Sequence, residues 1–204
     1  KLSKRKGAVA VTQFKEDGYL PEAVNNFLAL LGWSHPEGKE IMNFKDMSEN
    51  FTLDRVHAAG AIFDRVKLKW MNAQHLRALP NSEIWQQIQP FLQKAGLKLP
   101  VDSDWHNKSV ETFKPRMELL ADAVALYSPL DDSKYEIADE SNETLKADFA
   151  KGVLNAWKEC VEKHSKETFT EAEFLAIQDE VKNKSGQKGK NLFFPIRIAL
   201  IGKP

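Results

Sequence analysis

The sequence predicts an all-α fold. Apolar residues recur three and four positions apart along most of the 204 residues, and the alternating pattern of strands is found at most over residues 8–11. Proline, serine, threonine and glycine stand at the ends of these apolar runs, as is typical of helix boundaries. With 42% hydrophobic residues and no internal repeat, the chain can form one large domain or two small ones.

Three helices are predicted in the N-terminal half, over residues 21–31, 64–76 and 82–92. The first opens with Pro21, which suits a first helical turn, and stops at Gly32. The residues Pro80, Asn81 and Ser82 together end the second helix and cap the third. Because Pro90 lies inside the third pattern, it predicts a kink or a break there.

Four further helices are predicted over residues 115–126, 145–160, 171–181 and 192–200. Pro115 marks the start of the first of these, and a loop follows it at residues 127–132. Thr170 and Glu173 have the spacing of a capping box and open the third helix.

Four tryptophans stand at helical spacing among apolar neighbours: Trp70, Trp85, Trp105 and Trp157. We expect their large rings to pack in the core. The alternative is that they stack on nucleic-acid bases, which requires exposed rings.

Composition excludes several classes of protein. No apolar run approaches the roughly 18 residues of a membrane-spanning helix, and the mean hydropathy is −0.46. A single Cys160 excludes a disulfide framework, and the five histidines lack metal-ligand spacing, so we expect no metal site and a reducing, intracellular compartment. The N-terminus lacks both Met and the apolar region of a signal peptide, which favours an interior piece of a longer protein.

Charge is balanced overall but unevenly distributed. The 29 basic and 29 acidic residues cancel, which argues against nonspecific binding of polyanions. Lys and Arg make up four of the first six residues, residues 182–204 carry basic but no acidic side chains, and residues 131–143 are strongly acidic. Separate basic regions suit a protein that contacts an anionic polymer at chosen points, although an ordinary solvated surface has the same pattern.

The N-terminal string KLSKRK, residues 1–6, can carry chemistry. Closely spaced lysines beside a small residue can gather around a triphosphate and stabilise the charge that develops as pyrophosphate leaves. A basic tail is the alternative. Ser3 and Lys6 also match the S-x-x-K pattern of serine acyl enzymes, but the companion motifs of those enzymes are missing.

An ordered set of motifs resembles glutamyl-tRNA synthetases over essentially the whole chain. The motifs are KLSKR at 1–5, GYLPEA at 18–23, NFLALLGW at 26–33, F-x-L-x-R-V at 51–56, AIFD at 61–64, KLKWMN at 67–72 and PIRIALIG at 195–202. The last one stands for the family's P-L-R-x-A-L-T-G, with Ile201 at the Thr position. Ala59 and Gly60 depart from the Ser-Pro-like residues that relatives more often have.

The resemblance implies a class I synthetase that attaches glutamate to tRNA(Glu) through an adenylate made from ATP with Mg. The loop of residues 1–5 would be the only catalytic element in the chain, with Lys4 at the ATP phosphates and Lys1, Ser3 and Arg5 beside it. Family members have a nucleotide-binding fold before this loop and a further contact loop after Gly202. The chain alone is therefore expected to be inactive and to hold neither ATP nor Mg.

The resemblance also implies two regions and a set of tRNA contacts. Residues 1–79 would form the KLSKR loop and a stem-contact region, and residues 80–204 a C-terminally truncated, helical anticodon-binding domain. Arg116 would read the third anticodon base and so separate tRNA for glutamate from tRNA for glutamine, because a guanidinium offers a planar fork of donors to an unstacked base. Arg197 would face the anticodon loop. Four residues could line stem phosphates: Arg55, Lys67, Lys69 and Arg77.

Each of these assignments has an alternative in the residues themselves. Arg116 could be a surface residue in the first turn of a helix, where the helix dipole disfavours it. Arg197 could extend from the edge of a core helix to solvent, and the four stem candidates could be ordinary surface charges. The expected protein is a cytoplasmic monomer that binds tRNA and neither DNA nor membrane. An all-α protein-interaction module without RNA binding stays the alternative.

Overall fold

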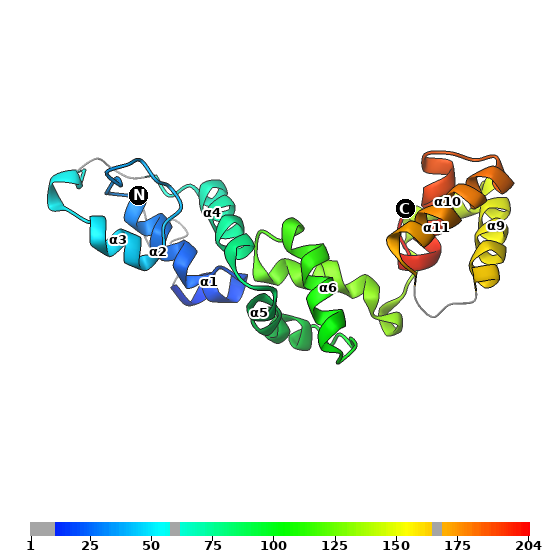
Figure 1. Cartoon of the computed structure of the whole chain (residues 1–204), viewed down its shortest axis with the longest axis horizontal. Coiled ribbons are helices and arrows are strands. Elements are labelled where there is room, and N and C mark those ends of the chain that lie inside the picture. Colours follow the sequence, from blue (N-terminus) through cyan, green and yellow to red (C-terminus); the bar gives the residue numbers. More distant parts are fainter. Residues whose placement is uncertain (1–10, 58–61, 165–168) are drawn as a thin grey trace. The chain divides into compact units, whose positions relative to one another are not determined.

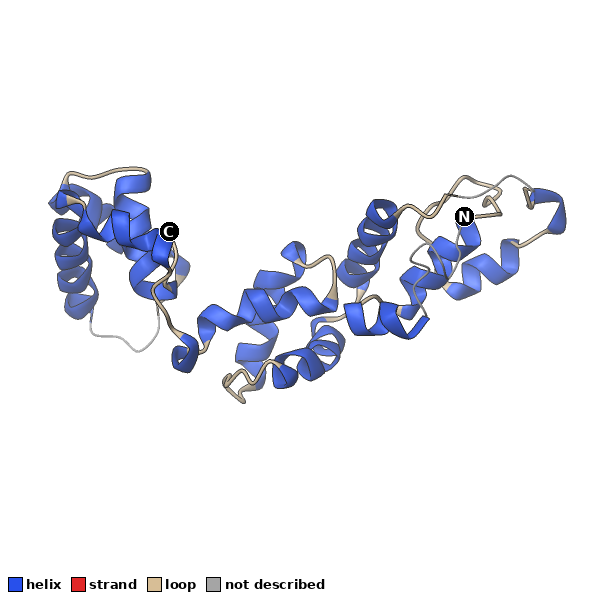
Figure 2. Cartoon of the chain, turned by 180° about the vertical axis from the view of Figure 1, so that it is seen from behind, coloured by secondary structure: helices blue, strands red, loops and turns tan. Residues whose placement is uncertain are grey.

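The structure, a computed structural model, describes residues 11–57, 62–164 and 169–204. Figures 1 and 2 show helices joined by loops. Over the described ranges the only extended pairing is an isolated antiparallel bridge between Trp33 and Val56, so the all-α prediction is confirmed. The chain forms two compact units, Lys1–Ser128 and Pro129–Pro204. The predicted boundary at Leu79–Pro80 lies inside unit 1 and stays a prediction.

Unit 1 is built from short helices and 3₁₀ turns. They are α1 (Val11–Asp17), α2 (Pro21–Leu30), α3 (Phe44–Asn50), η2 (Leu53–Arg55), α4 (Arg65–Ala78), α5 (Asn81–Lys94), α6 (Ser103–Phe113), η3 (Lys114–Arg116), η4 (Leu120–Asp122) and α7 (Ala123–Tyr127). The Asp64 carboxylate caps α4 by accepting from the backbone N–H groups of Val66 and Lys67. Helix α5 continues through Pro90 to Lys94, so the chain does not break there, and the alternative of a kink at Pro90 stays a prediction.

The main core of unit 1 lies where α5, α6, η4 and α7 meet the end of α4. Its buried members include Leu76, Ile84, Ile88, Val110, Met117, Leu120 and Tyr127. Trp85 and Trp105 pack against this core as predicted, and the Trp85 ring stacks on His106 with centroids 3.9 Å apart. Trp70 is different, because 41% of its surface is exposed on α4, so the core prediction is wrong for this residue.

The segment after α6 also departs from the sequence prediction. A helix over 115–126 was expected, but the chain forms the turn η3, extends at Met117 and Leu119, and forms the turn η4 before α7. The Asp122 carboxylate accepts hydrogen bonds from the backbone N–H groups of Glu118 and Leu119, at 2.9 and 2.8 Å. In addition, the buried Asn72 amide on α4 donates to the Glu118 carbonyl at 2.6 Å. These bonds replace those that a continuous helix would make.

Unit 2 is a small helical bundle. Its helices are α8 (Asn142–Lys146), α9 (Asp148–His164), α10 (Glu171–Ser185) and α11 (Lys190–Ile201), preceded by the turns η6 (Asp132–Lys134) and η7 (Asp139–Ser141). The turn η5 (Ser128–Leu130) spans the sequence boundary between the two units. Val153, Cys160, Ile177, Val181, Leu192 and Ile196 form its buried core, with Trp157 packed beside them. The predicted helix over 145–160 is divided by Ala147, which is extended. The predicted capping box of Thr170 and Glu173 is confirmed.

The end of α11 is held by the acidic segment of unit 2. The Gly202 carbonyl accepts from the Ala138 N–H at 3.0 Å and from the Ser141 hydroxyl at 2.9 Å. The Tyr135 hydroxyl donates to the Ile198 carbonyl at 2.9 Å. Gly202 has a φ of 77°, and a Cβ on it would lie 1.9 Å from the Glu136 carbonyl oxygen. The position therefore requires glycine for both conformation and space.

Candidate nucleic-acid interface

Arg116 projects from a short turn that is anchored on both sides. Just before the turn, the Phe113 ring packs edge-on against Tyr127 with centroids 4.9 Å apart. Just after it, Met117 is fully buried and its N–H donates to the Lys114 carbonyl at 3.2 Å. Arg116 itself is exposed. Among the described residues, no hydrogen bond or ion pair engages its guanidinium, which is therefore free to donate to a ligand.

Helix α4 fixes the same turn from one side. The Arg77 guanidinium donates to the Pro115 carbonyl at 3.1 Å, and the Lys114 ammonium donates to the Leu79 carbonyl at 2.5 Å. About two turns earlier on α4, Lys69 pairs with the Glu118 carboxylate at 2.7 Å, and this hydrogen bond is the main reason that the pKa of Lys69 is raised. The segment from 114 to 118 is thus attached to α4 at several points, although the Lys69–Glu118 pair is partly exposed and worth little by itself.

The four predicted stem contacts each have a partner within the chain. Lys67 pairs with Glu40 at 2.5 Å, Lys69 with Glu118, Arg77 with the Pro115 carbonyl, and Arg55 lies 3.5 Å from the His35 carbonyl. Arg55 and Arg77 are exposed, whereas Lys67 and Lys69 are half-buried. The structure therefore brings Lys69 and Arg77 to the turn of Arg116. Binding of tRNA by these four residues stays a prediction.

Arg197 lies on α11 between the buried Ile196 and Ile198. Its side chain is exposed and makes no ion pair or hydrogen bond within the part of unit 2 that the structure describes.

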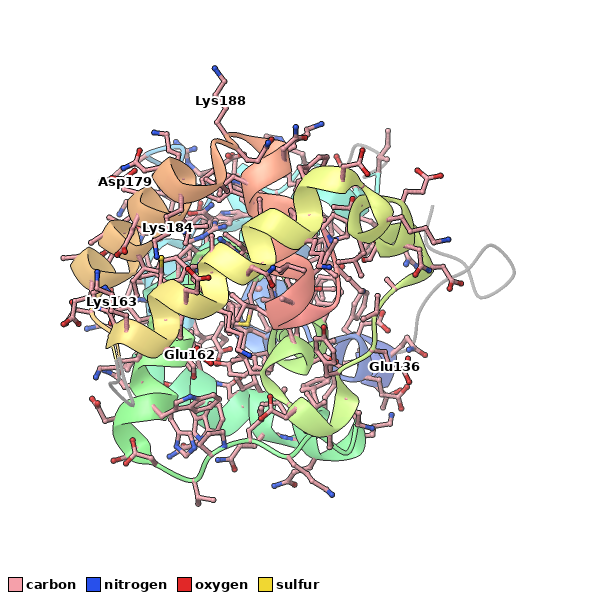
Figure 3. All side chains as sticks on the ribbon, turned by 90° about the vertical axis from the view of Figure 1, so that its right-hand side faces the viewer. Glu136, Glu162, Lys163, Asp179, Lys184 and Lys188 are labelled. Atoms are coloured by element: carbon pink, nitrogen blue, oxygen red, sulfur yellow. The ribbon has the colours of Figure 1, made fainter. Side chains whose placement is uncertain are left out.

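The lysines that precede Arg197 in the sequence divide into paired and open ones. Lys184 pairs with Glu159 at 3.4 Å and with Glu180 at 3.6 Å, across α9 and α10. Lys188, in the loop before α11, extends away from the ribbon (Figure 3). In this basic stretch, the positive charges without an acidic partner among the described residues thus include Lys188 in the loop before α11 and Arg197 on α11.

The sequence also led to predictions about ATP binding, metal binding and membrane spans. Lys1, Ser3, Lys4 and Arg5, the predicted ATP-binding residues, lie outside the described residues. Over the described ranges, no group of three His, Cys, Asp or Glu side chains is placed to hold a metal ion. The helices in those ranges are all too short or too polar to span a membrane. Sequence reasoning missed Asn72, whose only signal was its place in the KLKWMN motif.

Two family models together cover most of the chain. Residues 83–204 match the model described as "Anticodon binding domain", and residues 1–70 match "tRNA synthetases class I (E and Q), catalytic domain". The all-α fold and the first of these matches define an anticodon-binding chain of the aminoacyl-tRNA synthetase class. The chain belongs to the bacterial glutamate–tRNA ligase family.

Individual relatives agree with this assignment. The chain is 59% identical over 204 residues to a glutamate–tRNA ligase of Bdellovibrio bacteriovorus, matching 100% of the chain and 42% of that protein. It is 37% identical to glutamate–tRNA ligase 1 of Fervidobacterium nodosum, matching 100% of the chain and 40% of the relative. A crystal structure of a glutamate tRNA ligase from Elizabethkingia meningosepticum, in complex with its amino acid, superimposes with a TM-score of 0.79 at 26% identity, covering 100% of the chain and 43% of that structure. The chain thus spans less than half the length of these relatives.

Proposed function

We propose that this chain recognises tRNA(Glu) and that Arg116 reads the third base of the anticodon. The observation that supports this most directly is the free, exposed guanidinium on a turn whose neighbours are fixed. A rigid turn lowers the conformational cost of placing the side chain against a base. Residues 80–204 would contact the anticodon and residues 1–79 the stem.

The chemistry of the third base explains why an arginine suits this position. Glutamate codons require C there, and glutamine codons require G. The pairing edge of an unstacked cytosine offers two neighbouring acceptors, N3 and O2, which match the planar fork of a guanidinium. Guanine places N–H donors at the corresponding part of its edge, so the same fork would meet donors and leave them unpaired. The arginine therefore favours C by attraction and disfavours G by repulsion.

The remaining contacts follow from charge. Arg197, with the open lysines near it, would approach the anticodon loop, and Arg55, Lys67, Lys69 and Arg77 would approach stem phosphates. Phosphate contacts raise affinity without regard to sequence and weaken with salt, whereas base contacts set discrimination. In the longer protein, ATP with Mg would bind at the string of residues 1–5, and glutamate would be attached to the tRNA. We propose a cytoplasmic monomer.

Binding of two tRNAs to the chain tests this proposal. One is tRNA(Glu), and the other is the same tRNA with G at the third anticodon base. Arg116→Gln is expected to weaken binding of the first by about 1–3 kcal/mol, or roughly 5- to 150-fold, and to bring the two affinities together. Lys94→Gln, an exposed change of the same charge on α5, serves as the control. An unchanged ratio of the two affinities in Arg116→Gln would show that the assignment is wrong, and no tRNA binding at moderate salt would favour a protein-interaction module.

A further inference from the structure

We infer that Arg77 is a positioning residue for Arg116: it sets the reading of the third anticodon base by holding the turn that carries Arg116, and not by contacting the tRNA. This role rests on the function proposed for Arg116. On this inference, Arg77 contributes to the discrimination between the two third bases and does not bind a stem phosphate.

The contact between Arg77 and Pro115 acts directly on the backbone of Arg116. The Pro115 carbonyl and the N and Cα atoms of Arg116 belong to one planar peptide group. The Arg77 guanidinium donates to that carbonyl at 3.1 Å and so fixes the tilt of the plane from which the Arg116 side chain departs. On either side, the Lys114 ammonium donates to the Leu79 carbonyl and the Met117 N–H donates to the Lys114 carbonyl, and these two bonds hold the ends of the turn.

Arg77 is itself held by its own helix. With its amide oxygen facing the two donors, Gln74 accepts from the Arg77 guanidinium at 3.2 Å and from the Trp70 indole N–H at 3.3 Å. One nitrogen of the guanidinium is thus directed to Gln74 and the other to Pro115. Because both of these nitrogens are hydrogen-bonded, the Arg77 guanidinium is preorganised for its contact with the Pro115 carbonyl. It is also less available to a phosphate than the guanidinium of Arg116, which has no such partner among the residues that the structure describes.

The two readings of Arg77 predict different results. A phosphate ligand adds affinity for every tRNA, so its loss weakens both third-base forms by the same factor and lowers the salt dependence. A positioning residue leaves the form with G nearly untouched and weakens only the form with C, because Arg116 no longer meets its base correctly.

Arg77→Ala, Arg116→Gln and the double variant form a cycle that measures the coupling between the two arginines. In the 204-residue chain, Arg77→Ala is expected to reduce the C-to-G affinity ratio by about two- to thirtyfold. It should have no further effect on the ratio when Arg116 is already Gln. Arg77→Lys keeps a single donor and should restore part of the ratio, and Lys94→Ala, with the same change of charge, should leave it unchanged. An equal loss for both tRNAs with a smaller salt slope, or full additivity in the cycle, overturns the positioning role.

Amide hydrogen exchange tests the positioning without tRNA. The N–H of Met117 closes the turn on the Lys114 carbonyl, so its exchange should become faster in Arg77→Ala and stay the same in Lys94→Ala. If exchange becomes faster but Arg116→Gln leaves the affinity ratio unchanged, Arg77 holds the turn and the proposed base reading by Arg116 is what fails. If exchange of Met117 is unchanged, Arg77 does not position the turn, whatever the tRNA measurements give.

Discussion

Replacing Gly202 by Ala should destabilise unit 2 far more than the same change at Gly186. Both glycines end a helix in the left-handed conformation, with φ values of 77° and 67°. A Cβ on Gly186 would have no atom within 4 Å, whereas one on Gly202 would lie 1.9 Å from the Glu136 carbonyl oxygen. Comparing Gly186→Ala with Gly202→Ala therefore separates the free-energy cost of the left-handed backbone conformation from the cost of the close approach to Glu136.

The expected magnitude follows from these two costs. A left-handed conformation costs a residue with a Cβ roughly 1–2 kcal/mol, and the reduced freedom of the unfolded chain returns about 0.4–1 kcal/mol. Gly186→Ala should thus destabilise the protein by about 0–1.6 kcal/mol, with about 1 kcal/mol as the central value. In Gly202→Ala the clash is with backbone, so the acidic segment must move away. It would then lose the bonds from Ala138 and Ser141 to the Gly202 carbonyl, each worth about 1 kcal/mol. We expect a total of about 3 kcal/mol.

Hydrogen exchange by mass spectrometry can follow unit 2 separately from unit 1. Peptides from α9, α10 and α11 report the free energy of opening of the bundle, and urea unfolding of the same variants gives the global value. Gly202→Ala should also speed exchange at the Ala138 N–H, because its acceptor is displaced. A difference between the two variants below about 0.5 kcal/mol would refute the close approach at Gly202 as the reason for the glycine.

Two smaller changes test other parts of the fold. Thr170→Ala removes the acceptor for the Glu173 N–H and should cost about 1 kcal/mol, with Thr170→Ser close to the parent in urea unfolding. A Ser variant as unstable as the Ala variant would contradict the capping role. Burial lowers the pKa of His75 below its ordinary 6.5, although Glu22 opposes this, so the unfolded chain takes up the proton first as the pH falls. The stability that comes from neutral His75 should therefore be fully present above pH 6.5 and be lost as the pH falls through the lowered pKa. His75→Gln should flatten the dependence of the unfolding free energy on pH in this range. An identical pH dependence in that variant would contradict the role of His75.

The sequence predicted those elements whose signals lie within a few residues. The capping box spans only four positions, and Pro21 and Asp64 start their helices through local geometry and local hydrogen bonds. The class of fold followed from the same kind of information, because apolar spacing is a property of each helix alone. Such features need no knowledge of the partner helices.

The segment that carries Arg116 could not be predicted in this way. Its shape depends on Asn72, which lies 46 positions before Glu118 in the sequence and is buried between α4 and the turn. Periodicity at 115–126 suggested a helix because Met117 and Leu120 do enter the core, but Met117 is extended after η3 and Leu120 lies in the turn η4. The core prediction for Trp70 was wrong for a different reason. Trp70 stands among apolar neighbours in the sequence, yet its side chain is exposed on α4.

The partners within the chain also rank the basic residues as ligands. An exposed ion pair contributes about 0–1 kcal/mol, so Lys67 and Lys69 could exchange their carboxylates for phosphates at small cost. Arg77 would have to give up a backbone carbonyl that shapes the neighbouring turn. Arg116 and Arg197 have nothing to give up within the described chain. Sequence alone treats all five as equivalent positive charges, and only their surroundings indicate which of them a bound tRNA would engage first.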